Sequence, residues 1–268
     1  MALPPPASSS AALVTGASSG IGAEIARELG RRGHNLVLVA RRADRLDELA
    51  AELGDRSGVS AKPIAADLGV AAERDRMVAE LEALGLAVEV LVNCAGFGSV
   101  GDLHRDDRES LLAMVRLSCE AVLDLQARYS PAMAERGRGA IISLASTAAF
   151  QPMPTNAAYA ATKAFVLSLG EATHAELSGS GVTVTVVCPG PVKTEFADAA
   201  GIPDSEDRVP GFVWTPAADV ALAALDGADR GRRVVVPGLL NRAGAISGQH
   251  APRALALPLV KRIWSRAL

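Results

Sequence analysis

The chain carries a tyrosine and a lysine four residues apart, Tyr159 and Lys163, and Ser146 lies thirteen residues upstream of the tyrosine. Four residues are about one helical turn, so the phenol and the ammonium are predicted to project from the same face of a helix. An unperturbed phenol has a pKa near ~10, too high for acid–base chemistry at neutral pH. A cation one turn away favours the phenolate and lowers that pKa, so the pair is suited to general acid–base catalysis. The spacing alone is common in helices, so other features must supply a cofactor and a binding site.

A glycine-rich turn lies between the first predicted strand and the first predicted helix, in the run Thr15-Gly-Ala-Ser-Ser-Gly-Ile-Gly22. Gly16 permits the tight turn, while Gly20 and Gly22 let the backbone and the helix N-terminus approach a pyrophosphate. The spacing is G-x-x-x-G-x-G and not the commoner G-x-G-x-x-G. Its position between a strand and a helix predicts a dinucleotide site. The residues expected to contact the dinucleotide here are Gly16, Ser18, Ser19, Gly20, Ile21 and Gly22.

The end of the second predicted strand indicates which nicotinamide dinucleotide is bound. An NAD site needs an acid at this point to hold the ribose hydroxyls. Here Arg41 and Arg42 follow the strand, and the first carboxylate is Asp44. A cation neutralises the additional 2′-phosphate of NADP, and the Ser18 hydroxyl is placed to donate to the same phosphate. The alternative is that both arginines are simply solvated at a helix start. The pattern favours NADP over NAD.

Strand-like and helix-like stretches alternate from residue 11 to about residue 236. Continuous apolar runs such as 35–40 are typical of strands that are covered on both faces. Helical crossovers between such strands predict an α/β fold: a single Rossmann-fold domain over 11–240, with a doubly wound parallel sheet of about seven strands and helices on both faces. The predicted strands are 11–15, 35–40, 59–65, 88–92, 140–144, 182–187 and 233–236. The predicted helices are one that Gly33 ends, then 45–53, 72–84, 107–135, 156–178 and one that starts near Pro216.

Three segments stand apart from this alternation. Residues 1–10 are expected to form a flexible arm. Residues 193–215 are expected to form a lid, because a long loop at the carboxyl edge of such a sheet usually covers the ligand. Residues 241–268 mix apolar and basic side chains, and are predicted to be either an amphipathic helix at a membrane surface or a helix packed on the domain or a partner subunit. The apolar lid residues indicate a hydrophobic substrate; they are Phe196, Ile202, Phe212, Val213 and Trp214.

In order and spacing, the motifs of this chain resemble those of the classical short-chain dehydrogenase/reductase family over nearly all of residues 11–236. The motifs that carry the resemblance are Thr15-Gly-x-x-x-Gly20-x-Gly22, Asp67-Leu68, Asn93-x-Ala95-Gly96, Ser146, Tyr159-x-x-x-Lys163 and Pro189-Gly190-x-x-x-Thr194. The resemblance implies an NADP-dependent oxidoreductase of the carbonyl reductase or alcohol dehydrogenase type. Such an enzyme transfers a hydride between the nicotinamide and a carbonyl or secondary alcohol.

The resemblance also implies where the cofactor is held. Asp67 binds the adenine amino group, and Leu68 supplies a backbone contact beside it. The segment that contains Asn93, Ala95 and Gly96 steadies the central strand and lines the cofactor. The residues expected at the nicotinamide end are Pro189, Gly190, Val192 and Thr194, of which Thr194 bonds the carboxamide.

Catalytic roles follow from the same resemblance. Tyr159 is implied to be the general acid/base, Ser146 to hold the substrate oxygen, and Lys163 to bind the nicotinamide ribose and lower the pKa of Tyr159. One position departs from the family pattern, because Ser118 stands where the family commonly has an asparagine. That asparagine helps to hold a water that connects the lysine to solvent. Serine is shorter but can still bond a water, so Ser118 is predicted to serve a modified proton relay.

The composition excludes several other classes of function. A formal charge of -3 provides no basic field for holding nucleic acid. Three scattered cysteines are interpreted as core residues and form neither a disulfide framework nor a zinc site, and four dispersed histidines predict no metal. No window reaches about 18 uninterrupted apolar residues, and the N-terminus lacks the features of a signal peptide. The protein is therefore expected to have no transmembrane segment and to be cytoplasmic.

The predicted helix over 156–178 bears on assembly. It is apolar almost all round, and a helix without a polar face is normally buried on both sides. Only one side can cover the sheet, so the other is predicted to meet a second subunit in a homodimer or homotetramer.

Two other functions stay open: an epimerase or dehydratase with the same fold and a tightly held cofactor, and a non-catalytic NADP-binding regulatory protein. Ser118 is the only feature that supports the latter.

Overall fold

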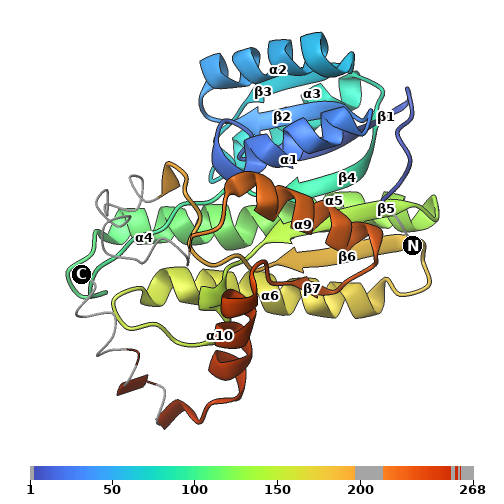
Figure 1. Ribbon diagram of the computed structural model, residues 1–268. Coiled ribbons are helices and arrows are strands. Elements are labelled where there is room, and N and C mark those ends of the chain that lie inside the picture. The colour runs from blue at the N-terminus through green and yellow to red at the C-terminus, as the bar shows by residue number, and fades with distance from the viewer. Residues whose placement is uncertain (1–2, 197–213, 255–256, 259, 261–268) are drawn as a thin grey trace.

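A computed structural model describes residues 3–196, 214–254, 257–258 and 260. These residues form a seven-stranded sheet with the order β3-β2-β1-β4-β5-β6-β7 (Figure 1), and all neighbouring strands are parallel. The strands are β1 (Ser10–Thr15), β2 (Asn35–Ala40), β3 (Ala61–Ala65), β4 (Ala87–Asn93), β5 (Gly139–Leu144), β6 (Val182–Val187) and β7 (Val234–Val235). From β1 the chain builds the sheet outward through β2 and β3, and then returns to the other side of β1 with β4.

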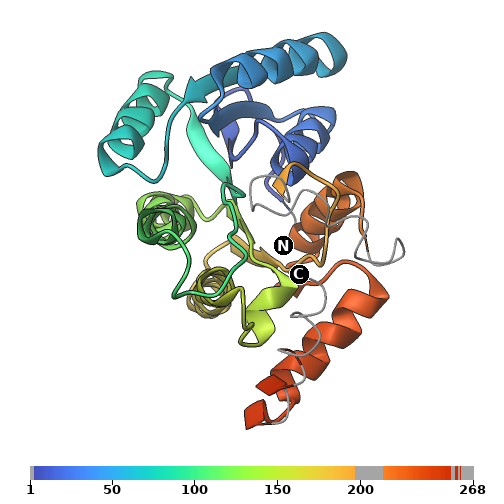
Figure 2. The same ribbon diagram turned by 90° about the vertical axis from the view of Figure 1, so that its left-hand side faces the viewer.

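Helices cover both faces of this sheet, as Figure 2 shows. One face is covered by α1, α2 and α9, and the other by α3, α5 and α6. The helices with regular bounds are α1 (Gly20–Arg31), α2 (Ala43–Ser57), α3 (Ala71–Ala83), α4 (Arg108–Val115), α5 (Ala121–Glu135), α6 (Ala157–Glu176), α9 (Ala217–Asp229) and α10 (Leu239–His250). Two shorter pieces are a π-helical turn, η1 (Arg116–Glu120), and a 3₁₀ turn, η2 (Thr147–Phe150).

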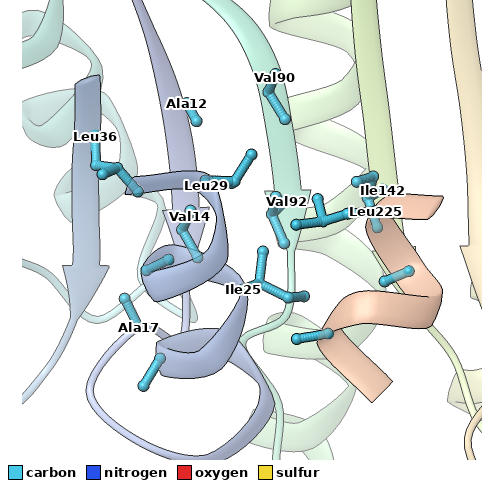
Figure 3. Packing of buried hydrophobic residues seen from close by; sticks show 14 of the residues in the cluster. Ala12, Val14, Ala17, Ile25, Leu29, Leu36, Val90, Val92, Ile142 and Leu225 are labelled. Atoms are coloured by element: carbon cyan, nitrogen blue, oxygen red, sulfur yellow. The ribbon is translucent and has the colours of Figure 1, made fainter. Parts of the chain in front are cut away.

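Hydrophobic core lies on each face of the sheet, between the strands and these helix layers. Successive residues of a strand point to opposite faces, so on β1 Val14 joins one core and Leu13 joins the other. In Figure 3, Ile25 of α1 and Leu225 of α9 pack against strand residues such as Val92. Burial on both faces explains why the strands are continuous apolar runs, and the two cores hold the strand ends in a fixed relation to one another.

The predicted fold class is confirmed, with three differences in the elements. α2 runs on to Ser57, past the predicted end at residue 53, and stops where Gly58 adopts a left-handed φ of 65°. β7 pairs only at Val234 and Val235, so the last strand is shorter than predicted. The predicted helix over 107–135 is present as α4, η1 and α5, and the π-helical turn inside it was not predicted. Such turns insert an extra residue into a helix and often occur at functional sites.

The N-terminal segment differs from the flexible arm expected over residues 1–10. Leu3 is buried, and its backbone N–H donates to Oδ1 of Asp229 at 3.0 Å. The described part of the arm therefore packs against the end of α9, and Ser10 already belongs to β1. No helix among the described residues is long and apolar enough to cross a bilayer.

Candidate active site

A cavity of about 540 Å³ lies beyond the carboxyl ends of the strands. It lies at the point between β1 and β4 where the order in which strands are added to the sheet reverses. Ligands of doubly wound sheets bind at this switch point. The lining of the cavity brings together the glycine turn after β1, both arginines after β2, and residues that follow β3, β4, β5 and β6. All the candidate site residues named from the sequence line this cavity, except Asn93 and Ser118.

The glycine turn has the conformation that its sequence predicts. Gly16 and Gly20 have positive φ values of 69° and 56°, and a Cβ at Gly22 would lie 2.3 Å from the Gly16 carbonyl oxygen. Side chains are therefore excluded at these positions. α1 begins at Gly20, so its first backbone N–H groups lie at the cavity, where they suit an anion.

Thr15 ties this turn to the end of β4. Its Oγ1 donates to the Val92 carbonyl oxygen at 3.0 Å and accepts from the backbone N–H groups of Cys94, at 3.0 Å, and Ala95, at 3.1 Å. The sequence analysis quoted Thr15 within its motif but assigned it no role. A buried threonine at the end of the central strand, directly before the first glycine, was the available signal.

Arg42 is held against the glycine turn by several hydrogen bonds. Its Nη2 donates to Ser18 Oγ at 3.0 Å and to Ser19 Oγ at 2.8 Å, while its Nη1 pairs with Oε2 of Glu195 at 2.7 Å. The hydrogen bond from Arg42 is the main reason that the pKa of Glu195 lies below its usual value. Arg41 lines the same cavity. Glu195 was not recognised in the sequence, although it directly follows Thr194 of the last motif.

The residues expected at the adenine end also line the cavity. Asp67 and Leu68 follow β3, and Oδ1 of Asp67 accepts the N–H of Gly69 at 2.9 Å. Asn93 is different, because it is buried in the sheet and its Nδ2 donates to Ser143 Oγ on the neighbouring strand at 3.3 Å. This position agrees with the strand-steadying role expected for it and takes it out of direct contact with a ligand.

Ser146, Tyr159 and Lys163 meet at the end of β5. Ser146 caps η2, where its Oγ accepts the Ala148 N–H at 3.1 Å, so its own hydroxyl hydrogen can be donated elsewhere. Tyr159 and Lys163 lie one turn apart on α6, and the lysine Nζ is 5.6 Å from the centroid of the tyrosine ring. The buried Lys163 also donates from Nζ to the Leu144 carbonyl oxygen at 2.9 Å. A backbone acceptor of this kind leaves no signal in a sequence.

Burial governs the ionisation of this group. It raises the pKa of Tyr159 to about 12, and a hydrogen bond with Ser146 acts in the opposite direction. The pKa of Lys163 is lowered, mainly by its own burial. The prediction that Lys163 lowers the pKa of Tyr159 is therefore wrong. The pKa is raised instead, because the loss of solvent around the phenol has the largest effect on it. Tyr159 is protonated at neutral pH.

Three thiols lie close enough to Lys163 to affect its ionisation: Cys94, Cys119 and Cys188. All three cysteines are free, and burial raises the pKa of each, to about 12 for Cys94 and Cys188. These thiols are thus protonated and poorly nucleophilic. Cys188 is a buried core residue as expected, whereas Cys94 and Cys119 are only partly buried. No cluster of three or more potential metal ligands occurs in the part of the chain that the structure describes.

Ser118 lies on η1, fully buried, and its Oγ has no hydrogen-bond partner among the described residues. A Cβ placed on Gly96 would lie 3.7 Å from this oxygen and 3.6 Å from Lys163 Nζ. The serine and the lysine therefore approach the same point of the cavity wall from two helices. The role of Ser118 in a proton relay stays a prediction.

Apolar side chains form the wall of the cavity beside the tyrosine. The ring of Phe196 packs against that of Tyr159 with centroids 5.6 Å apart, and a Cβ at Gly98 would lie only 2.9 Å from the phenylalanine ring. Of the lid residues named from the sequence, Phe196 and Trp214 line the cavity, whereas Ile202, Phe212 and Val213 lie outside the described residues. The other apolar wall residues are Phe97, Val100, Leu117 and Met153.

The comparisons with known proteins agree with this architecture. The family model for short chain dehydrogenases matches residues 10–203. A very-long-chain 3-oxoacyl-CoA reductase from Anas platyrhynchos is 35% identical over 195 residues, which cover 69% of this chain and 61% of that protein. The chain thus aligns with less than two thirds of that reductase.

Two solved structures cover nearly the whole chain. A short-chain dehydrogenase from Sphingobium yanoikuyae, in complex with NADPH, has 38% sequence identity and a TM-score of 0.80, and the match covers 89% of this chain and 92% of that one. A bulky-bulky ketone specific alcohol dehydrogenase from Comamonas testosteroni has 31% identity and a TM-score of 0.75, with coverage of 97% and 94%. Because the family model and the complete folds agree, the chain belongs to the short-chain dehydrogenase/reductase family of oxidoreductases.

Proposed function

We propose that this protein is an NADP(H)-dependent carbonyl reductase or alcohol dehydrogenase whose substrate is a hydrophobic ketone or the matching secondary alcohol. The observation that carries the proposal is that Tyr159, Ser146 and Lys163 line the same cavity as the glycine turn and Arg42. A proton donor, an oxygen-binding hydroxyl and an anion-binding site are thereby combined. An oxidoreductase that reduces a carbonyl group needs all three.

The residues in the cavity fit a nicotinamide dinucleotide phosphate. The glycine turn and the N-terminus of α1 suit its pyrophosphate, and Asp67 and Leu68, which line the same cavity, are assigned to its adenine. The Arg42 guanidinium supplies the positive charge that a 2′-phosphate needs, and Ser18 and Ser19, against which it is held, supply hydroxyl groups. When bound, NADP(H) supplies or accepts the hydride. The relative that binds NADPH supports the same choice of cofactor.

The chain's own residues handle the proton. Tyr159, protonated at neutral pH, donates its phenolic proton to the carbonyl oxygen during reduction and takes a proton from the alcohol during oxidation. Ser146 directs its free hydroxyl hydrogen at the same oxygen and stabilises the charge that develops there. Lys163 is assigned the nicotinamide ribose, and Ser118 the proton path behind the lysine.

The apolar wall supports a hydrophobic substrate. The ring of Phe196 packs against that of Tyr159 at a tilt of 56°, and Met153 and Trp214 line the same cavity. A ketone with bulky apolar substituents would bury them against these side chains, and each buried aromatic ring contributes about 1.5–3 kcal/mol. The named preference of the Comamonas testosteroni relative for bulky-bulky ketones supports this assignment.

The proposal is tested with the purified protein, NADPH and a graded set of ketones: acetone, acetophenone and a diaryl ketone. We expect kcat/KM to rise at least about tenfold when the first phenyl group is added, since burial of apolar surface supplies the difference. NADPH absorbance measures the rate. NADPH that binds without being consumed on any carbonyl substrate would leave only the non-catalytic function, and a preference for acetone would contradict the hydrophobic substrate.

The pH dependence is expected to differ between the two directions. With the pKa of Tyr159 at about 12, reduction uses the dominant protonated phenol, so its rate should stay flat between about pH 6 and about pH 9. Oxidation uses the phenolate. At pH values below the pKa, the fraction of phenolate increases about tenfold for each unit by which the pH is raised, and the rate should follow it. Initial rates measured in both directions at saturating cofactor check this. A flat oxidation profile together with a steep reduction profile would contradict the assignment of the proton to Tyr159.

The outer side of α6 supports the predicted self-association. Phe165 on α6 is exposed, and so are Val115 of α4 and Leu123 of α5 on the neighbouring helices. A second copy placed on this face would bury these apolar side chains. The oligomeric state and the cytoplasmic location remain predictions.

A further inference from the structure

The face of helix α10 that contacts its own domain carries small and polar residues, among them Asn241, Ala245 and Gly248. It follows β7 and extends away from the sheet, as Figure 1 shows. A Cβ at Gly190 would lie 2.2 Å from Asn241 Oδ1, and a Cβ at Gly248 would lie 2.8 Å from Gln151 Oε1, so these residues mark where the helix contacts the domain. Ala245 is its only buried residue. Burial of one alanine is too little to explain why the helix is held on this surface.

Of the large apolar residues of α10, Leu239 and Ile246 point the other way, and Leu240 lies at the side of the helix between the two faces. Leu239, Leu240 and Ile246 are 86%, 62% and 52% exposed. At about 3.6 residues per turn, Leu239, Ala243, Ile246 and His250 lie on the side of the helix opposite Asn241, Ala245 and Gly248. The helix is amphipathic, but its apolar side faces outward. This arrangement indicates a surface that another apolar phase covers.

The charge of this part of the chain is segregated from the rest. Residues 230–268 contain eight Lys and Arg and no Asp or Glu. Residues 1–229 therefore contain the other 19 of the chain's 27 basic residues and all 30 acidic residues, and carry a formal charge of -11. Among the described residues of the basic part, Arg232, Arg242 and Arg253 are exposed. In the sequence, the exposed apolar residues of α10 thus lie within a basic stretch, in which Arg233 pairs with Glu171 at 2.9 Å. The net positive charge of this stretch complements an anionic surface.

A second copy of the chain fits this face poorly. Closed symmetric dimers bring the same patch of both subunits together. An interface through α10 would therefore bring Arg242 and the other basic residues of this stretch in one subunit near those of the other. An anionic bilayer meets both demands at once, because it accepts apolar side chains between its headgroups and carries negative charge.

We propose that α10 is a docking helix that lies on the surface of a membrane rich in anionic phospholipid, with Leu239, Leu240 and Ile246 inserted between the headgroups and the flanking arginines paired with phosphates. Docking of this kind needs no spanning helix. The helix adjoins Gly190 and η2, whose residues line the cavity. A consequence that rests on the proposed function is that apolar substrates dissolved in the bilayer would be held near the cavity wall.

The test is co-sedimentation of the full-length protein with two kinds of vesicle: phosphatidylcholine alone, and equal amounts of phosphatidylcholine and phosphatidylglycerol. We expect binding to the mixed vesicles only, and a decrease of at least about tenfold in the partition coefficient for the triple variant Leu239→Ser, Leu240→Ser and Ile246→Ser. Leu103→Ser is the matched control, because Leu103 is 59% exposed elsewhere on the surface. The control variant should bind like the unaltered protein.

A second pair of variants tests the charge. Arg242→Glu with Arg253→Glu should weaken binding and remove most of its salt dependence, whereas Arg108→Glu, another exposed arginine, should not. Equal binding to both kinds of vesicle, or to neither, would overturn the proposal. So would sedimentation velocity showing that the triple variant changes the oligomeric state, because α10 would then be covered by a second copy. None of these readouts requires turnover, so a failed activity test leaves them interpretable, and the reverse also holds.

Discussion

Replacing Tyr159 with phenylalanine is expected to lower kcat about a hundred- to ten-thousandfold, the range that a positioned general acid contributes. Phenylalanine fills the same space between Ser146 and Phe196 but has no proton to donate. Cofactor binding should be nearly unchanged, because Arg42 and the glycine turn are untouched. NADPH fluorescence titration measures the dissociation constant, and steady-state rates with an aryl ketone measure kcat.

Tyr129 provides the matched control, since the chain contains only two tyrosines. Its hydroxyl is also buried, has no hydrogen-bond partner among the described residues, and has a pKa raised to about 12 by burial. Tyr129→Phe removes the same atom away from the cavity and should leave kcat unchanged. Equal loss in the two variants would mean that Tyr159 acts through stability, and full activity of Tyr159→Phe would exclude it as the acid.

Replacing Arg42 with alanine is expected to raise the Kd for NADP about ten- to hundredfold and to leave the Kd for NAD nearly unchanged. Hydrogen bonds to a charged group contribute about 1.5–3 kcal/mol, and this guanidinium is aligned by Ser18 and Ser19 at the predicted 2′-phosphate position. The two dinucleotides differ only in that phosphate. Titration of the variant with each of them isolates the contribution of Arg42.

Two companion variants sharpen this result. Arg41→Ala should have a smaller effect, because no hydrogen bond fixes Arg41 at the turn among the described residues. Glu195→Gln should tighten NADP binding about two- to fivefold, the value of an exposed ion pair, since the phosphate no longer competes with the carboxylate for Arg42. A larger loss for Arg41 than for Arg42, or a variant of Arg42 that weakens both dinucleotides equally, would contradict this assignment.

Much of the fold could be predicted from local patterns. Buried parallel strands need continuous apolar runs, and crossovers need helices between them, so the alternation along the chain was enough to identify a doubly wound sheet. The glycine turn was also predictable, because positive φ and close backbone contacts leave glycine as the only residue that fits. These constraints act between residues that are close in the sequence, so the order of residue types is enough to predict them.

Contacts between distant segments could not be predicted in this way. Glu195 meets Arg42 across 153 residues of chain. Ser118, in the π-helical turn η1, approaches Lys163 of α6 only in the folded chain. The outward apolar side of α10 depends on which side of the helix touches the domain, whereas the residues themselves only show that the helix is amphipathic.

The sequence alone therefore determined the family, and it predicted the dinucleotide site and the Tyr159–Lys163 pair, since each rests on residue types at short, fixed spacings. Only the tertiary structure decided which arginine is held at the turn and in which direction the pKa of Tyr159 moves. The spacing predicted that a neighbouring cation would lower this pKa, yet burial raises it to about 12. Desolvation depends on all the atoms packed around the phenol, and these come from several elements that only folding brings together.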